Sequence, residues 1–179
     1  MIRKVMRNIL KHVIVLLLPL MLLACSTPAM TASEKVTHAL DDHGEIRPFS
    51  KRQDDSKRVD AAIIEAAQSD KKALIVMGAN WCHDSRALAT HFEKPEFKEL
   101  IQSSFILEYI NVGRKDKNQD LARRFGLDGT PGTPTVLIID GTGALLNPEE
   151  APTWRNAASR SESEIYNYFE SYAAESADP

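Results

Sequence analysis

One apolar run that ends just before a Trp-Cys pair constrains the fold of this chain more than any other segment. Residues 73–77 read Ala-Leu-Ile-Val-Met, and after a short turn residues 81–85 read Trp-Cys-His-Asp-Ser. Residues 85–92 then continue with the pattern of a helix. The order predicts a buried strand, a turn and a helix, with Cys82 at the start of the helix. Unpaired N–H groups and the dipole at a helix start favour a thiolate, so we expect a chemical site at Cys82.

The other elements follow from hydrophobic spacing and from turn residues. We expect helices over residues 56–68, 95–101, 118–125 and 161–174, and strands over residues 105–112 and 135–140. A turn at residues 141–143 should pair the last strand with residues 144–146 as a hairpin, and a short strand is expected near residues 46–49. Strands that alternate with helices and finish in a hairpin predict an α/β fold, in which helices cover both faces of a mixed sheet.

The N-terminal segment, residues 1–24, has the composition of a secretory signal. Four basic residues precede an apolar run of 12 residues, Val13 to Ala24. That run is shorter than the ~20 residues that a membrane-spanning helix needs, and it suits a cleaved signal peptide better than an uncleaved anchor. The basic residues are Arg3, Lys4, Arg7 and Lys11.

The signal ends in Leu-Leu-Ala-Cys-Ser at residues 22–26, which resembles the lipobox of bacterial lipoproteins. The resemblance implies that Cys25 is lipidated with acyl chains such as palmitate and becomes the first residue after cleavage. Ser26 after the cysteine points, by the same resemblance, to a periplasm-facing protein at the outer membrane of a bacterial cell envelope. The alternative is an ordinary cleavage site that leaves Cys25 free.

Cleavage after residue 24 would leave 155 of the 179 residues, which suits one domain on a tether. We assign residues 1–24 to the signal peptide, 25–50 to a tether and 51–179 to the domain. Removing the signal's four basic residues from the chain's 22 leaves 18 against 25 acidic residues, a formal charge of −7. An acidic domain of this kind is a poor candidate for binding nucleic acid.

The chain has two cysteines, Cys25 and Cys82. If Cys25 is lipidated, the mature protein has a single thiol and cannot form an internal disulfide. Exported proteins enter an oxidising compartment. A lone cysteine there must be buried, capped or used between molecules.

Several segments together resemble the thioredoxin-like superfamily. They are the strand at residues 73–77, Trp81-Cys82-x-x-Ser85, Glu-Lys-Pro-Glu-Phe at residues 93–97, Phe125-Gly126, and Thr133-Pro134 before the strand that starts at Thr135. These segments span about residues 56–172, and they resemble exported and lipoprotein members more than cytosolic thioredoxin. The resemblance implies a thioredoxin-like fold and a redox site at Cys82.

Cys82 is the predicted nucleophile, which would attack a disulfide or be oxidised itself. Ser85 stands where two-cysteine motifs place their second thiol. One turn after Cys82, its hydroxyl is expected to hydrogen-bond the sulfur, but it cannot resolve a mixed disulfide. The pattern therefore favours monothiol exchange. The alternative is a structural Cys82 in an inactive domain, where Ser85 merely replaces a sulfur.

His83 and Asp84 lie between these two residues. A protonated His83 would favour the thiolate and Asp84 would oppose it; alternatively both are solvated residues of the first helical turn. By the resemblance, Trp81 flanks the exposed sulfur, although it could equally pack in the core.

The resemblance also implies a cis proline against the cysteine, preceded by a residue whose backbone pairs with a client protein. Both Pro131 and Pro134 compete for this position. We favour Pro134, with Thr133 as the client-binding residue, because a strand follows directly. Thioredoxin-type reductases have a buried acid six residues before the nucleophile, where this chain has Val76, so reductase activity is not favoured.

Other sites have little support in the sequence. We expect no cofactor and no metal, because His83 and His91 lie eight residues apart, too far for chelation from adjacent helical turns. No nucleophile elbow and no phosphate-binding loop is present. Trp154 follows the predicted hairpin, where it could anchor a loop on the core or close over the site.

The sequence therefore predicts an envelope-anchored thioredoxin-like protein that exchanges disulfides through Cys82 alone. Its expected partners are cysteine-containing envelope proteins or small thiols, together with a membrane that it reaches through lipid on Cys25. The alternative is a catalytically silent thioredoxin-like module that binds an envelope partner.

Overall fold

The computed structural model describes residues 44–52 and 54–174. The predicted signal peptide and the lipidation of Cys25 lie outside these residues. The described residues all belong to one compact unit, Thr37–Pro179.

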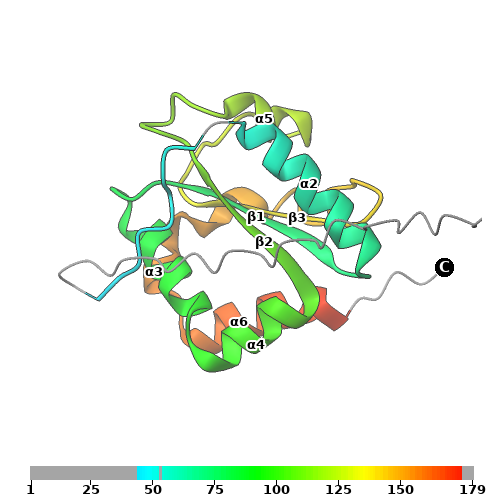
Figure 1. The fold of residues 1–179 in the computed structure, drawn as a ribbon. Coiled ribbons are helices and arrows are strands. Elements are labelled where there is room, and N and C mark those ends of the chain that lie inside the picture. Colours follow the sequence, from blue (N-terminus) through cyan, green and yellow to red (C-terminus); the bar gives the residue numbers. More distant parts are fainter. Residues whose placement is uncertain (1–43, 53, 175–179) are drawn as a thin grey trace, which may run out of the picture. The chain divides into compact units, whose positions relative to one another are not determined.

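Helices and strands alternate along the described chain (Figure 1). The elements are α2 (Asp55–Gln68), β1 (Lys72–Gly78), α3 (His83–Phe92), α4 (Pro95–Ser104), β2 (Phe105–Asn111), α5 (Gln119–Arg124), β3 (Thr135–Ile139), the 3-10 helix η2 (Ala151–Ser159) and α6 (Glu162–Ala174). Each helix and strand predicted between residues 56 and 140 is present, with ends shifted by a few residues at most. Helix α6 likewise matches the helix predicted over residues 161–174.

The three strands form one mixed sheet in the order β2-β1-β3. Strand β1 is central, parallel to β2 and antiparallel to β3. Gly78 at the end of β1 is paired with Asn111 at the end of β2, and Met77 is paired with Thr135 at the start of β3. This register brings the loops after β1 and β2, and the loop before β3, to one edge of the sheet.

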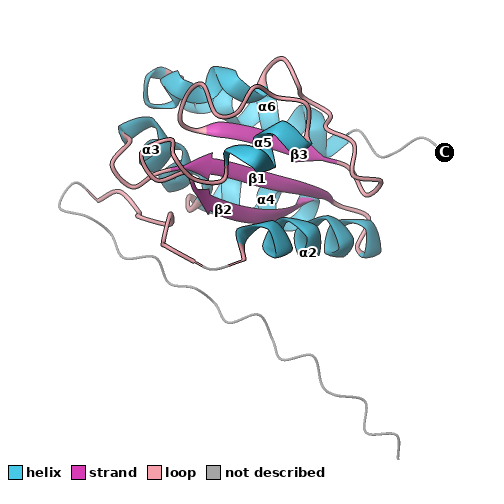
Figure 2. Ribbon diagram, turned by 90° about the horizontal axis from the view of Figure 1, so that it is seen from above, coloured by secondary structure: helices cyan, strands magenta, loops and turns pink. Residues whose placement is uncertain are grey.

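Helices cover both faces of the sheet, as Figure 2 shows from above. Helices α2 and α5 lie on one face, over a core that includes Ile75 and Ile110. Helices α3, α4 and α6 lie on the other face, over a core that includes Leu74 and Phe105. Because successive side chains of a strand point to opposite faces, strand β2 contributes Phe105 to one core and Ile110 to the other.

The predicted hairpin after β3 forms but is short: the Asp140 N–H donates to the Ala144 carbonyl at 3.0 Å and the Leu146 N–H donates to the Ile138 carbonyl at 2.8 Å. Residues 144–146 contribute one isolated bridge, between Ile139 and Leu145, instead of a strand. The buried side chain of Asn147 takes over the pairing edge of β3: its Oδ1 accepts from the Ile138 N–H at 2.9 Å and its Nδ2 donates to the Val136 carbonyl at 2.9 Å. A side-chain amide thus satisfies the backbone groups that a fourth strand would pair.

The strand expected near residues 46–49 is reduced to a single bridge residue, Ile46. Ile46 and Phe49 are buried, and side chains hold the segment in place of a ladder. The Ile46 N–H donates to Thr90 Oγ1 and the Phe49 N–H donates to Asn80 Oδ1, both at 3.1 Å. The last residues of the predicted tether therefore pack on the domain.

Helix η2 has no counterpart among the predicted elements. Its Trp154 is fully buried and stacks on Phe169 with ring centroids 5.2 Å apart. The alternative of Trp154 as an anchor on the core is the one that the structure shows, and a Trp154 lid over the site is wrong.

Candidate functional site

Cys82 lies at the junction of strand and helix that the sequence predicted. It is the N-cap residue of α3, with extended backbone angles (φ −88°, ψ 120°). Its side chain is 8% exposed, and its Sγ donates a hydrogen bond to the Thr133 carbonyl at 3.2 Å. It is the free cysteine of the described residues. The sulfur therefore meets the start of a ten-residue helix on one side and the loop before β3 on the other.

The peptide bond between Thr133 and Pro134 is cis. This is the proline that we favoured, and Thr133 before it is buried. The competing Pro131 lies at the surface, where its carbonyl accepts from Lys115 Nζ at 3.0 Å. The structure thus brings Cys82, Thr133 and Pro134 together at the edge of the sheet.

Ser85 does not make the predicted hydrogen bond to the sulfur. Its side chain is fully buried, and its Oγ has no hydrogen-bond partner. A Cβ built on Gly78 would lie 2.7 Å from this Oγ and equally close to the Phe49 ring. The hydroxyl therefore points into the core beneath the end of β1, because helix α3 turns this position inward.

His83 is exposed and is held by a residue that the sequence did not single out. Its Nδ1 lies 3.1 Å from Glu45 Oε1, and the other oxygen of Glu45 accepts from Arg86 Nε at 2.8 Å. Glu45 and Arg86 are both largely buried, whereas the His83 side chain is 67% exposed. Glu45 lies in the predicted tether, where no periodic pattern marked it.

Asp84 is not simply a solvated residue of the first turn. Its Oδ1 accepts from the Ala158 N–H at 2.9 Å and so connects α3 to η2. Six residues before Cys82, Val76 is fully buried among apolar side chains. The acid of thioredoxin-type reductases therefore has no counterpart on this strand.

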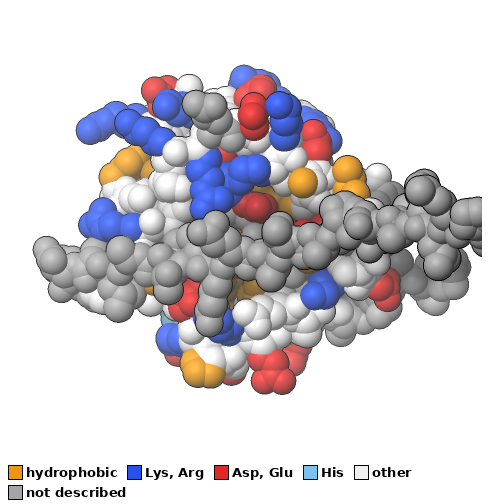
Figure 3. Space-filling model, viewed as in Figure 1, with side chains coloured by type: hydrophobic (Ala, Val, Ile, Leu, Met, Phe, Trp, Pro, Cys, Tyr) orange, Lys and Arg blue, Asp and Glu red, His pale blue; other side chains and the backbone are white. Residues whose placement is uncertain are grey.

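Trp81 does not pack in the core, so that alternative is wrong. Its side chain is 55% exposed, and its Nε1 donates to the Gly113 carbonyl at 2.7 Å. The indole forms part of a groove of about 510 Å³ between residues 49–51 and the loop at residues 113–117. Figure 3 shows Lys and Arg side chains projecting where this loop lies in Figure 1.

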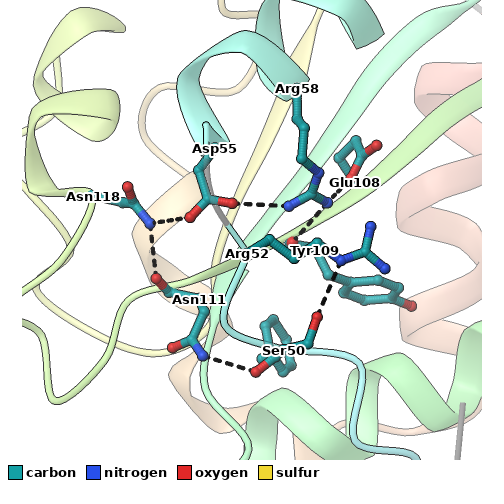
Figure 4. Close-up of polar contacts among 9 residues, drawn as sticks. Ser50, Arg52, Asp55, Arg58, Glu108, Tyr109, Asn111 and Asn118 are labelled. Atoms are coloured by element: carbon teal, nitrogen blue, oxygen red, sulfur yellow. Dashed lines mark hydrogen bonds and ion pairs between the residues drawn. The ribbon is translucent and has the colours of Figure 1, made fainter.

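A polar network beneath the groove was also missed by sequence reasoning (Figure 4). Asn111 donates to the Phe49 carbonyl at 2.8 Å, accepts from the Gly113 N–H at 2.8 Å, and its own carbonyl accepts from Asn118 Nδ2 at 2.9 Å. Asn118 also donates to Asp55 at 2.7 Å. The network connects the end of β2 to both walls of the groove.

The same network extends along α2 (Figure 4). Arg58 pairs with Asp55 at 2.9 Å and with Glu108, and it donates to the Tyr109 carbonyl at 3.2 Å. These contacts fix the start of α2 on strand β2. Asp55 is only three residues from Arg58, but Glu108 and Tyr109 are 50 and 51 residues away along the chain, so no sequence motif predicts those two contacts.

In the ranges 44–52 and 54–174, no group of three His, Cys, Asp or Glu side chains could hold a metal ion. Across the same ranges, no helix is long and apolar enough to cross a membrane.

Comparison with known proteins places the fold. Residues 55–141 match a family model described as thioredoxin-like. A disulphide isomerase from Xylella fastidiosa Temecula1 is 29% identical with a TM-score of 0.63, over 70% of this chain and 95% of that one. A thioredoxin from Thermus thermophilus is 19% identical with a TM-score of 0.50, over 66% of this chain and 85% of that one. The comparison with curated protein sequences gives no match.

These matches confirm the predicted α/β, thioredoxin-like fold with its mixed sheet and flanking helices. Over residues 55–141 the chain is therefore similar to thioredoxin-like proteins. The family match includes Cys82, Thr133-Pro134 and the strands β1, β2 and β3, whereas η2 and α6 lie beyond it.

Proposed function

We propose that this protein carries out thiol–disulfide exchange through Cys82 alone. The observation that carries the proposal is the position of the Cys82 sulfur, 3.2 Å from the Thr133 carbonyl and at the start of α3. The fold supports it, as does the similarity to a solved disulphide isomerase. In this site a thiol, a helix start and a buried backbone segment meet.

The exchange begins when the Cys82 thiolate attacks one sulfur of a client disulfide. A new Cys82–client disulfide forms, the client's own S–S bond breaks, and the leaving thiolate takes up a proton. The client must displace the contact between the Cys82 sulfur and Thr133. Clients would be cysteine-containing proteins or small thiols in their disulfide form.

Release of the client needs a second thiol from outside this site. Ser85 occupies the position of a resolving cysteine, and its oxygen cannot attack a disulfide. A thiol of the client or a small thiol attacks the Cys82 adduct, which regenerates Cys82 and leaves a rearranged or mixed disulfide elsewhere. This cycle conserves the number of disulfides, so it is isomerase-like and differs from net oxidation or reduction.

The groups around the sulfur are placed to influence the exchange. His83 directly follows Cys82, and its imidazole lies against Glu45. In its protonated form the imidazole would add positive charge near the sulfur. Trp81 and Thr133 would contact the client.

Anchoring in the cell envelope belongs to the same proposal. It rests on the lipobox-like residues 22–26 and on the basic, apolar segment before them. We propose that Cys25 carries the lipid and that the domain faces the periplasm, an oxidising compartment in which disulfides form and persist. Globomycin-type inhibition of lipoprotein processing would test this, because an unprocessed precursor should then accumulate.

A second candidate function is a silent binding module. The 8% exposure of Cys82 favours it, because a nucleophile must be reached by its target. In that case the cis-proline segment and Trp81 would hold a partner without covalent chemistry.

The test uses the full-length protein with Cys25→Ser, so that Cys82 is its single thiol. A small aromatic disulfide is added, and the mixed disulfide is followed by intact mass. We expect stoichiometric adduct with Cys25→Ser and none with Cys25→Ser/Cys82→Ser. A Cys82 that stays unmodified while the protein is folded would reject exchange and favour the binding module.

A further inference from the structure

The groove beside Trp81 has properties that the exchange reaction alone does not explain. It lies between residues 49–51 and residues 113–117, and Phe49, Ala79 and Trp81 contribute its apolar surface. Trp81 directly precedes Cys82, and its exposed indole donates a hydrogen bond to the Gly113 carbonyl in the groove wall. A segment lying in the groove therefore reaches the residue next to the sulfur. We call this feature the Trp81 groove.

The charged side chains that line the Trp81 groove are mostly positive. They are Lys51, Arg114 and Lys117, against a single carboxylate, Asp116. The Oδ1 of Asp116 already accepts a hydrogen bond from the Arg114 backbone N–H at 2.7 Å. The three cations are exposed and form no ion pair with any residue in 44–52 or 54–174. The whole chain has a formal charge of −3, so the charge of this groove is opposite in sign to that of the chain.

The walls of the groove are fixed before any ligand binds. Asn111 hydrogen-bonds the backbone of Phe49 on one wall and the backbone of Gly113 on the other. Asn80 pairs with both backbone groups of Phe49, at 3.1 and 3.2 Å. A groove held in this way costs a ligand little ordering free energy on binding.

We propose that the Trp81 groove binds an acidic peptide segment next to the disulfide of a client protein. Charge complementarity selects this occupant: carboxylates pair with Lys51, Arg114 and Lys117, and an apolar side chain covers the Trp81 indole. The inference rests on the proposed function and gives it a substrate class. Since the pairs form at the surface, the preference should weaken with added salt.

The first experiment measures binding without covalent chemistry. Full-length protein with Cys25→Ser/Cys82→Ala is titrated with two fluorescent, thiol-free peptides of equal length, one rich in glutamate around a central leucine and the other rich in lysine. Polarisation should show binding of the glutamate peptide, with affinity falling as salt rises. Replacing Lys51, Arg114 and Lys117 by Gln should weaken it about tenfold.

A matched control removes the same charge from other surfaces. The control replaces Lys71, Lys98 and Arg124 by Gln. It should change the affinity of the glutamate peptide by less than about twofold. Equal binding of the two peptides, or an equal loss in both triple variants, would overturn the proposal.

A second experiment separates this inference from the proposed function. The groove variant, with Cys82 retained and Cys25→Ser, is given a small aromatic disulfide that carries no charge. Its exchange rate should match that of the parent, because the groove cations touch neither the sulfur nor this probe. If no variant exchanges but the glutamate peptide still binds in a groove-dependent way, exchange is rejected and the groove proposal stands.

Discussion

Ser85→Ala should stabilise the protein, which is unusual for a substitution beside a candidate nucleophile. The Ser85 hydroxyl is fully buried and has no hydrogen-bond partner. A buried hydroxyl that lacks a partner costs about 1–3 kcal/mol. Removing it gives up the contacts of one heavy atom beside Phe49, which is worth less than ~1 kcal/mol. The free energy of unfolding should therefore rise by about 1 kcal/mol.

Thr135→Val provides the matched control. Thr135 is also fully buried, but its Oγ1 donates to the Gly132 carbonyl at 3.0 Å. Loss of this bond should lower the free energy of unfolding by about 1 kcal/mol. Urea unfolding of both variants and of the parent gives the two differences in unfolding free energy, provided that this free energy falls with urea at the same slope in all three proteins.

The same Ser85→Ala protein reports on the sulfur. Because Ser85 does not bond Cys82, alkylation of Cys82 by iodoacetamide should proceed at the parent rate in a Cys25→Ser background. A loss of stability above about 1 kcal/mol, or alkylation slowed by about tenfold, would refute this reasoning. Either result would mean that the hydroxyl has a partner in solution.

Three further predictions follow from the same structure. Ser85→Cys should supply a resolving thiol, so Cys82 adducts followed by intact mass should disappear with time; adducts as persistent as in the parent would contradict this. Burial and, secondarily, the charge of Lys94 lower the pKa of His91. Below about pH 6.5 the unfolded chain therefore binds a proton at His91 more readily than the folded protein does, so the urea midpoint should fall as the pH drops. His91→Gln should make the urea midpoint depend less on pH. Trp154→Ala should cost about 3–5 kcal/mol of unfolding free energy, and a loss below about 1 kcal/mol would argue against its buried position.

Local patterns in the sequence were enough to predict the scaffold. The apolar run of β1, the alternation along β2 and the helix after Cys82 each follow from periodicities of a few residues. Because one strand end and one helix start fix Cys82, the main site residue could be placed without any long-range information.

The contacts that the sequence did not reveal depend on single side chains far apart in the chain. Asn147 replaces a strand by bonding the edge of β3, and Asn111 joins two loops through three hydrogen bonds. Glu45 reaches His83 from a segment without periodicity. Ser85 was placed near the sulfur by helical spacing, but spacing alone does not say which way a hydroxyl points.

The central claim is that Cys82 works as a nucleophile, and trapping in living cells tests it most directly. Cells that express the full-length protein are quenched with acid, free thiols are blocked, and the protein is purified and separated without reductant beside Cys82→Ala. The account predicts discrete, reductant-sensitive adducts that are absent from the variant. A free and unmodified Cys82 in every preparation would contradict it.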